Sequence, residues 1–111
     1  SSHEPCSLCL SAITWCGFNN FYYLFSYNDT KKKYKIPHDL KILKEVFNIN
    51  NGEYIKDNYY WKSHSILESI SKLQNPDKEK LLEKAKRIRD LYESLSELYQ
   101  SSKISNNIPL N

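Results

Sequence analysis

The chain has 111 residues, enough for one domain with a modest hydrophobic core. Hydrophobic residues make up 40% and charged residues 26%, with 9 Tyr and only 2 Gly, so we expect a folded protein with little turn-rich β character. The formal net charge of +3 gives only mild attraction to anions and does not indicate nucleic-acid binding. No apolar run approaches the roughly 20 residues of a membrane-spanning helix, and no signal segment is present, so we expect a cytoplasmic protein without a membrane partner.

The first third of the chain predicts a helix followed by a strand. Pro5 suits the first turn of a helix and Gly17 suits its end, so residues 5–16 are predicted to form a short, mostly apolar and buried helix. The aromatic run 21–26, which lacks Gly and Pro, predicts a central strand. Residues 27–37 contain three consecutive lysines and are predicted to form a solvated loop.

The rest of the chain predicts helices joined by turns. Ser65 and Glu68 form a capping box for a helix that ends near Leu73. Asn75 and Pro76 supply the cap and the first residue of a last helix. The other predicted elements are a helix opened by Pro37 and continuing to Phe47, a turn over 48–52, and an aromatic loop over 54–61 that packs its rings against the body.

The last helix has the clearest hydrophobic periodicity of the chain. Its apolar residues recur at alternating spacings of four and three, which predicts one continuous stripe. Such a stripe is too wide for a helix left in water, so we expect it to contact another subunit of a homodimer or a further portion of the fold. The polar residues 101–111 are expected to fray. The stripe consists of Leu81, Ala85, Ile88, Tyr92, Leu95 and Tyr99, widened by Leu91 and Leu98.

Three cysteines without a secretory signal indicate thiols or metal ligands and not a disulfide framework. Cys6 and Cys9 are three residues apart, so a helix places both sulfurs at one spot. The helix N-terminus there, and a metal if present, would lower the thiol pKa values. Half of a zinc site, a redox pair and a buried inert pair are all compatible with this spacing. Cys16 is the spare thiol and is expected to be buried and inert.

The residues around this pair resemble the cytidine deaminase-like superfamily. The similarity is to the branch of guanine deaminases and tRNA adenosine deaminases and covers about the first two dozen residues. It rests on the run EPCSLCLSAI (residues 4–13), followed by Trp15 and by the strand residues 21–23. The resemblance implies an α/β chain, the C-terminal part of a three-layer α/β/α fold, helix-rich with few strands. It also implies Zn²⁺ held by Cys6 and Cys9 together with an upstream His or Cys, and hydrolytic deamination of a nucleobase or nucleoside, a guanine-type purine being favoured.

The same resemblance suggests roles for two further residues. Asp39 matches an acid that approaches the bound purine and helps to shuttle a proton, although an Asp at this point could equally be a helix N-cap. Trp15 matches an aromatic residue that lines the base pocket, and a Trp of the hydrophobic core is the alternative. His3 could approach a metal through the spacing His-x-x-Cys-x-x-Cys, but we favour an exposed residue without a role.

The other half of the deaminase motif is absent from this sequence. The three histidines and three cysteines form no His-x-Glu or Cys-x-Glu, which in the family supplies the third zinc ligand and the proton-carrying Glu. We therefore expect residues 1–47 to be the C-terminal half of a zinc deaminase-like domain, residues 48–111 to be a helical extension, and the N-terminal portion of the same fold to be a partner. The isolated chain should then be inactive.

The alternative is a noncatalytic zinc-binding or helical interaction module derived from a deaminase. A tRNA substrate would require a strongly basic surface, which the charge does not favour.

Overall fold

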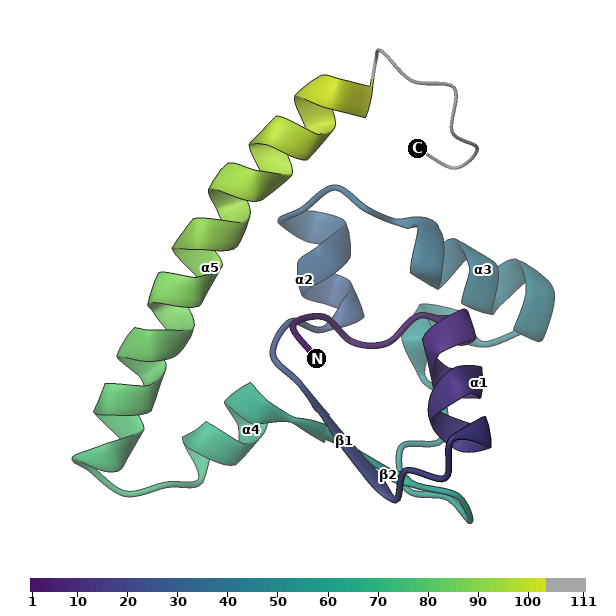
Figure 1. Ribbon diagram of the computed structural model, residues 1–111, viewed down its shortest axis with the longest axis horizontal. Helices are drawn as coiled ribbons and strands as arrows, with labels where there is room; N and C mark the ends of the chain where they lie inside the picture. The colour runs from purple at the N-terminus through teal and green to yellow at the C-terminus, as the bar shows by residue number, and fades with distance from the viewer. Residues whose placement is uncertain (104–111) are drawn as a thin grey trace.

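The computed structural model describes residues 1–103, which combine helices with a small sheet (Figure 1). This composition is compatible with the predicted α/β class. Residues 104–111, where most of the predicted frayed tail falls, lie outside the described part. None of the helices within residues 1–103 has both the length and the apolar character needed to cross a membrane. The elements are α1 (Ser7–Trp15), β1 (Asn20–Tyr23), α2 (Tyr27–Lys32), α3 (His38–Phe47), the 3-10 turn η1 (Asn50–Gly52), β2 (Lys62–Ser65), α4 (Ile66–Ser71) and α5 (Asp77–Ser102).

The strand β1 is the element on which the other extended segments pair. It pairs in parallel with β2, with Tyr23 opposite Ser65. The N-terminal residues lie beside the end of β1, where His3 forms a parallel bridge with Phe25. Parallel strands require a long crossover, and residues 24–61, which include α2 and α3, form it.

Two hydrophobic clusters fill the structure. Side chains along β1 alternate, so that Phe21 and Tyr23 are buried while Tyr22 is exposed. The first cluster also receives Leu10 and Ile13 from α1, and the second receives Tyr92 from α5. The first cluster consists of Phe21, Tyr23, Tyr27, Leu43, Tyr54 and Trp61, and the second of Leu24, Phe25, Tyr34 and Ala85.

The segment predicted as a solvated loop contains the helix α2, so that prediction is wrong. Ser26 and Asp29 form a capping box: the Asp29 N–H donates to Ser26 Oγ at 3.2 Å, and the Ser26 N–H donates to an Asp29 carboxylate oxygen at 3.1 Å. Tyr27 and Thr30 are buried on its inner side. Because the cap and the two buried side chains stabilise a helical turn, the lysines that follow only extend it into solvent.

The predicted helices around residues 5–16, 37–47, 66–73 and 77 onward are confirmed, whereas β2 was not predicted. The first helix was predicted to be buried, which is wrong, because no residue of α1 is buried. The last helix has Pro76, and not Asn75, as its N-cap residue. The β2 residues KSHS are polar and give no strand pattern, yet they complete the sheet. Residues 48–111 are therefore not purely helical. They also contribute Tyr54 and Trp61 to the first cluster, while Tyr59 from the same aromatic segment is exposed.

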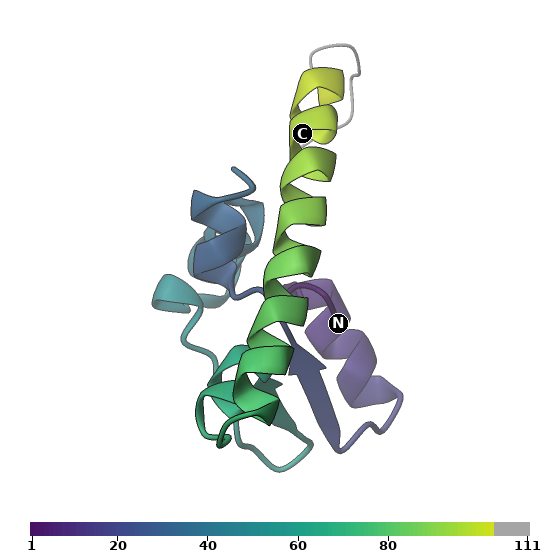
Figure 2. The same cartoon turned by 90° about the vertical axis from the view of Figure 1, so that its left-hand side faces the viewer.

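The long helix α5 lies along one side of the molecule, and its C-terminal end extends past the other elements (Figure 2). The predicted continuous stripe divides into two rows. One row faces the body and includes Ala85 and Tyr92. The other row is exposed and consists of Ile88, Leu91, Leu95 and Leu98.

Candidate metal centre

Cys6 and Cys9 lie together at the start of α1, as their spacing predicted. Cys6 is the N-cap residue and Cys9 lies in the first turn, so both sulfurs are at the end of the helix where backbone N–H groups are free. The Cys6 thiol donates to the Cys9 sulfur at an Sγ–Sγ distance of 3.5 Å, and both thiols are free. Two thiolates bound to tetrahedral zinc at about 2.3 Å lie about 3.8 Å apart, so the pair fits half of a zinc site with little movement.

The pKa of Cys9 does not follow the prediction. The hydrogen bond with Cys6 and, after it, burial raise the pKa of the Cys9 thiol above its usual value. The thiol is therefore protonated at neutral pH and is a poor nucleophile, because the thiolate is the reactive form. Cys9 is also exposed and Cys6 only half-buried, so the prediction of a buried pair is wrong.

The turn that presents the cysteines rests on a buried carboxylate that the sequence did not single out. Glu4 accepts hydrogen bonds from the Tyr27 N–H and the Tyr54 hydroxyl, both at 2.9 Å. Lys56 Nζ lies 3.3 Å from the same carboxylate. The Tyr27 hydroxyl donates to the carbonyl of Pro5, immediately before Cys6. Glu4 thus ties the start of α1 to the start of α2 and to the segment before β2.

Asp39 lies near the cysteines and is not a helix N-cap. Pro37 is the N-cap residue of α3, with no side-chain hydrogen bond, and Asp39 is the second residue within the helix. Burial raises the pKa of the Asp39 carboxyl, and His38 and His3, when protonated, oppose that rise only in part. The charge of Asp39 in turn contributes to the raised pKa of Cys9. The structure therefore brings Asp39 into the electrostatic environment of the cysteine pair.

His3 is half-buried, contrary to the prediction that it is exposed. Its ring lies 5.1 Å from the ring of Phe25 and 5.1 Å from that of Tyr92. Burial lowers the pKa of His3, and the charge of Asp39 opposes this effect. His3 is therefore held neutral within an aromatic cluster that joins the N-terminal residues to α5.

Trp15 and Cys16 lie at the opposite end of α1 from the cysteine pair. Trp15 is 90% exposed, so the alternative of a core Trp is wrong. It is six residues beyond Cys9, which corresponds to about 9 Å along the helix axis. Cys16 is also exposed, and the prediction of a buried thiol is wrong because α1 contacts the body on one side only. The described residues therefore do not bring Trp15 to the cysteines.

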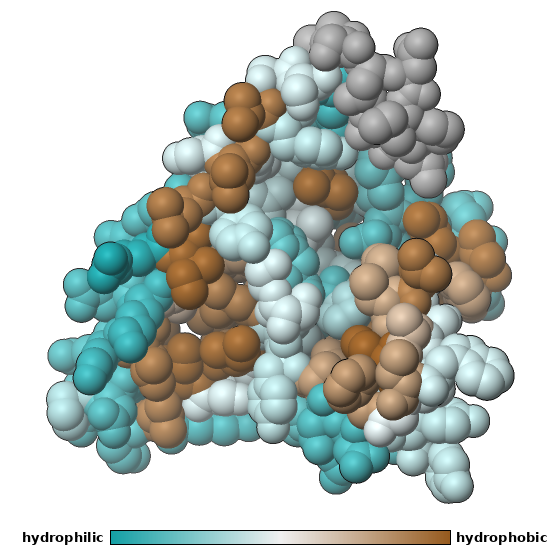
Figure 3. All heavy atoms as spheres, viewed as in Figure 1, coloured by the Kyte–Doolittle hydropathy of each residue, from teal (hydrophilic) through white to brown (hydrophobic). Residues whose placement is uncertain are grey.

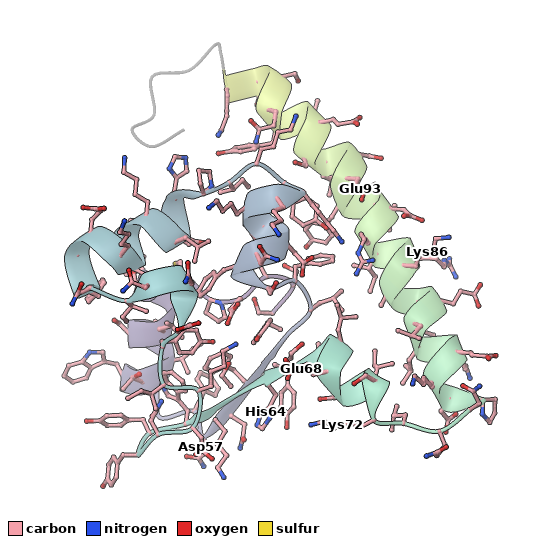
Figure 4. All side chains as sticks on the ribbon, turned by 180° about the vertical axis from the view of Figure 1, so that it is seen from behind. Asp57, His64, Glu68, Lys72, Lys86 and Glu93 are labelled. Atoms are coloured by element: carbon pink, nitrogen blue, oxygen red, sulfur yellow. The ribbon has the colours of Figure 1, made fainter. Side chains whose placement is uncertain are left out.

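Zinc needs more ligands than this site provides. Over residues 1–103, no group of three or more His, Cys, Asp and Glu side chains is placed to hold a metal ion. His64 stacks on Tyr22 at 4.8 Å between ring centroids, and this face of β1 is opposite to the one that packs on α1. Figure 4 shows His64 and Glu68 projecting from β2 and α4. The described part of the chain thus offers two sulfurs and a nearby carboxylate.

Comparisons of the chain with protein-family models, with curated proteins and with solved structures find no match. The resemblance to the deaminase superfamily therefore rests on the residues from Glu4 to Tyr23 and remains a prediction.

Proposed function

We propose that this chain supplies two thiolate ligands, Cys6 and Cys9, to a zinc centre for hydrolytic deamination of a nucleobase or nucleoside. The observation that carries the proposal is the Sγ–Sγ distance of 3.5 Å between two accessible free thiols at a helix N-terminus. The helix N-terminus favours the negative charge that the thiolates acquire when they bind metal. Bound zinc supplies Lewis-acid activation of water at neutral pH.

The residues of this chain have distinct tasks in the proposal. Cys6 and Cys9 bind the metal, and Glu4 holds the backbone of their turn through Tyr27 and Tyr54. Asp39 is the candidate proton carrier, because a carboxyl with a raised pKa holds and releases a proton closer to neutral pH. The resemblance favours a guanine-type purine, and Trp15 remains a proposed base contact only if a further segment brings the base to the end of α1.

A further segment must complete the centre. Within residues 1–103, the outward face of α1 is apolar and exposed. It consists of Leu8, Cys9, Ala12, Trp15 and Cys16. A helix this apolar is normally covered on both sides. This face is the place where the portion carrying the missing ligand and the proton-carrying Glu would pack. The chain alone should therefore release no ammonia from guanine, cytidine or adenosine.

Cobalt(II) binding tests the metal site directly. Titration of the purified chain with Co²⁺ should give the charge-transfer absorption of thiolate ligands in the near ultraviolet, because Co²⁺ occupies zinc sites. Cys6→Ser and Cys9→Ser should each remove most of this absorption, while Cys16→Ser, the matched control, should keep it. Equal loss in all three variants, or no thiolate absorption in the unmodified chain, contradicts the assignment.

The alternative function is a noncatalytic zinc-binding or interaction module. One observation on the described residues favours this alternative. An apolar hollow is lined by Leu10, Tyr54 and Trp61, but neither cysteine of the pair nor Asp39 lines it, so a base bound there would not meet the metal ligands. Ammonia release separates the two functions. If the chain binds metal through Cys6 and Cys9 but stays inactive after the segment with the His-x-Glu or Cys-x-Glu motif is added, the noncatalytic alternative is correct.

A further inference from the structure

The outer face of α5 carries an apolar row that the rest of residues 1–103 leaves exposed. Ile88, Leu91, Leu95 and Leu98 recur at spacings of three, four and three residues, and we call these four residues the outer seam. They are 40%, 66%, 56% and 67% exposed, in that order. Figure 3 shows apolar side chains in a line along α5. The spacing is that of the a and d positions through which two helices pair in a coiled coil.

The contacts of α5 with its own subunit use another face. Ala85 and Tyr92 belong to or pack against the second hydrophobic cluster. Ser96 Oγ and Gln100 Nε2 donate to the carbonyl of Tyr34 at 3.3 and 3.0 Å. The outer seam is therefore free to contact another molecule while α5 stays docked on the body.

The charge distribution of α5 indicates what that molecule is. Residues 77–89 contain six Lys or Arg and three Asp or Glu, a formal charge of +3. Residues 90–102 contain three Asp or Glu and no Lys or Arg, a formal charge of −3. A second copy running in the opposite direction places the basic half of each helix beside the acidic half of the other. Parallel copies would place like charges together, which is unfavourable.

We propose that the outer seam is a self-association surface through which the α5 helices of two copies pair in antiparallel orientation. The pairing places Ile88 opposite Leu98 of the second copy and Leu91 opposite Leu95, which is the packing of a against d positions. Burial of these aliphatic side chains supplies the driving force. Arg87, which borders a hollow with Lys84, Ile88 and Leu91, then lies beside Ser101 of the second copy, which flanks the same side of the seam within two residues of the level of Arg87. This association does not depend on the cysteine site or on the proposed function.

Sedimentation equilibrium of the full chain, with and without substitutions, tests the association. The unmodified chain should be a dimer, and Leu91→Glu should be a monomer with an unchanged circular dichroism spectrum, because Leu91 is exposed in the subunit. Its control is Lys86→Glu, which adds negative charge to α5 on another face (Figure 4) and should stay dimeric.

Substitutions at Ser101 test the orientation. In the antiparallel pair, Ser101→Glu adds two symmetric ion pairs with Arg87 and should lower the dissociation constant roughly three- to tenfold, while Ser101→Lys should raise it by a similar factor. In a parallel pair position 101 lies far along the helix from Arg87 of the second copy, so the two variants would dissociate alike. A monomeric unmodified chain, a dimeric Leu91→Glu variant, or identical dissociation constants for the two Ser101 variants each overturns the proposal. A monomer that binds a different protein through the seam also overturns it.

Discussion

Replacement of Glu4 by alanine should remove the support beneath the cysteine pair and strongly destabilise the fold. The Glu4 side chain is 3% exposed, and its carboxylate accepts two hydrogen bonds of 2.9 Å, from Tyr27 and Tyr54. A hydrogen bond to a buried charged group contributes about 1.5–3 kcal/mol. The Lys56 side chain is 47% exposed, so its ion pair with Glu4 adds little in water. The two hydrogen bonds together predict a loss of about 3–5 kcal/mol in the free energy of unfolding.

Urea unfolding followed by circular dichroism measures this loss. Glu4→Gln should cost less, about 1–2 kcal/mol, because the amide can accept from Tyr27 and donate to Tyr54 but carries no charge. The matched control is Asp57→Ala, which removes an ion pair with Lys62 whose side chains are 70% and 58% exposed and should change stability by less than about 0.5 kcal/mol. A Glu4→Ala variant within about 1 kcal/mol of the unmodified chain, or no more unstable than Asp57→Ala, would refute the reasoning.

Two further substitutions give expected changes of defined sign. Gly52→Ala should destabilise the protein by about 2–4 kcal/mol in urea unfolding, because Gly52 has φ +71° and an added Cβ would collide with the Tyr27 ring. The control is Gly17→Ala, which has φ +72° and open space around it and should cost only about 1 kcal/mol. Equal losses in the two variants would contradict the collision. Asp39→Asn should raise the urea midpoint at pH 7. Burial raises the pKa of Asp39 in the folded state, so the protonated carboxyl contributes stability at low pH, and this contribution is lost as pH rises through that pKa. Asparagine carries no charge at pH 7 and avoids the loss. The gain from Asp39→Asn should vanish near pH 3, and a gain of equal size at both pH values would contradict it.

The parts of the fold that depend on neighbouring residues were predictable from the sequence. Gly17 ends α1 with a positive φ, and Ser65 Oγ accepts from the Glu68 N–H at the start of α4. The two sulfurs of the cysteine pair meet because residues three apart share a helix face. Each of these features involves residues within a few positions of one another, so composition and spacing were sufficient to predict them.

The parts that depend on distant residues were not predictable. The strand β2 is polar and forms because β1, about 40 residues earlier, offers it a partner. The role of Glu4 depends on Tyr27 and Tyr54, which are 23 and 50 positions away. The exposure of Trp15 follows from which side of α1 the body covers, and the apolar composition of that helix gives no sign of it.

The hydrogen bond between Glu4 and Tyr54 also determines when the cysteine turn becomes ordered during synthesis. Glu4 is translated 50 residues before Tyr54, and the strand β2 follows Tyr54. Contacts of such sequence separation form late, since the intervening loop must close before they stabilise anything. The thiols of Cys6 and Cys9 are therefore synthesised well before they acquire their support, and during that interval both are open to oxidation and to premature metal capture.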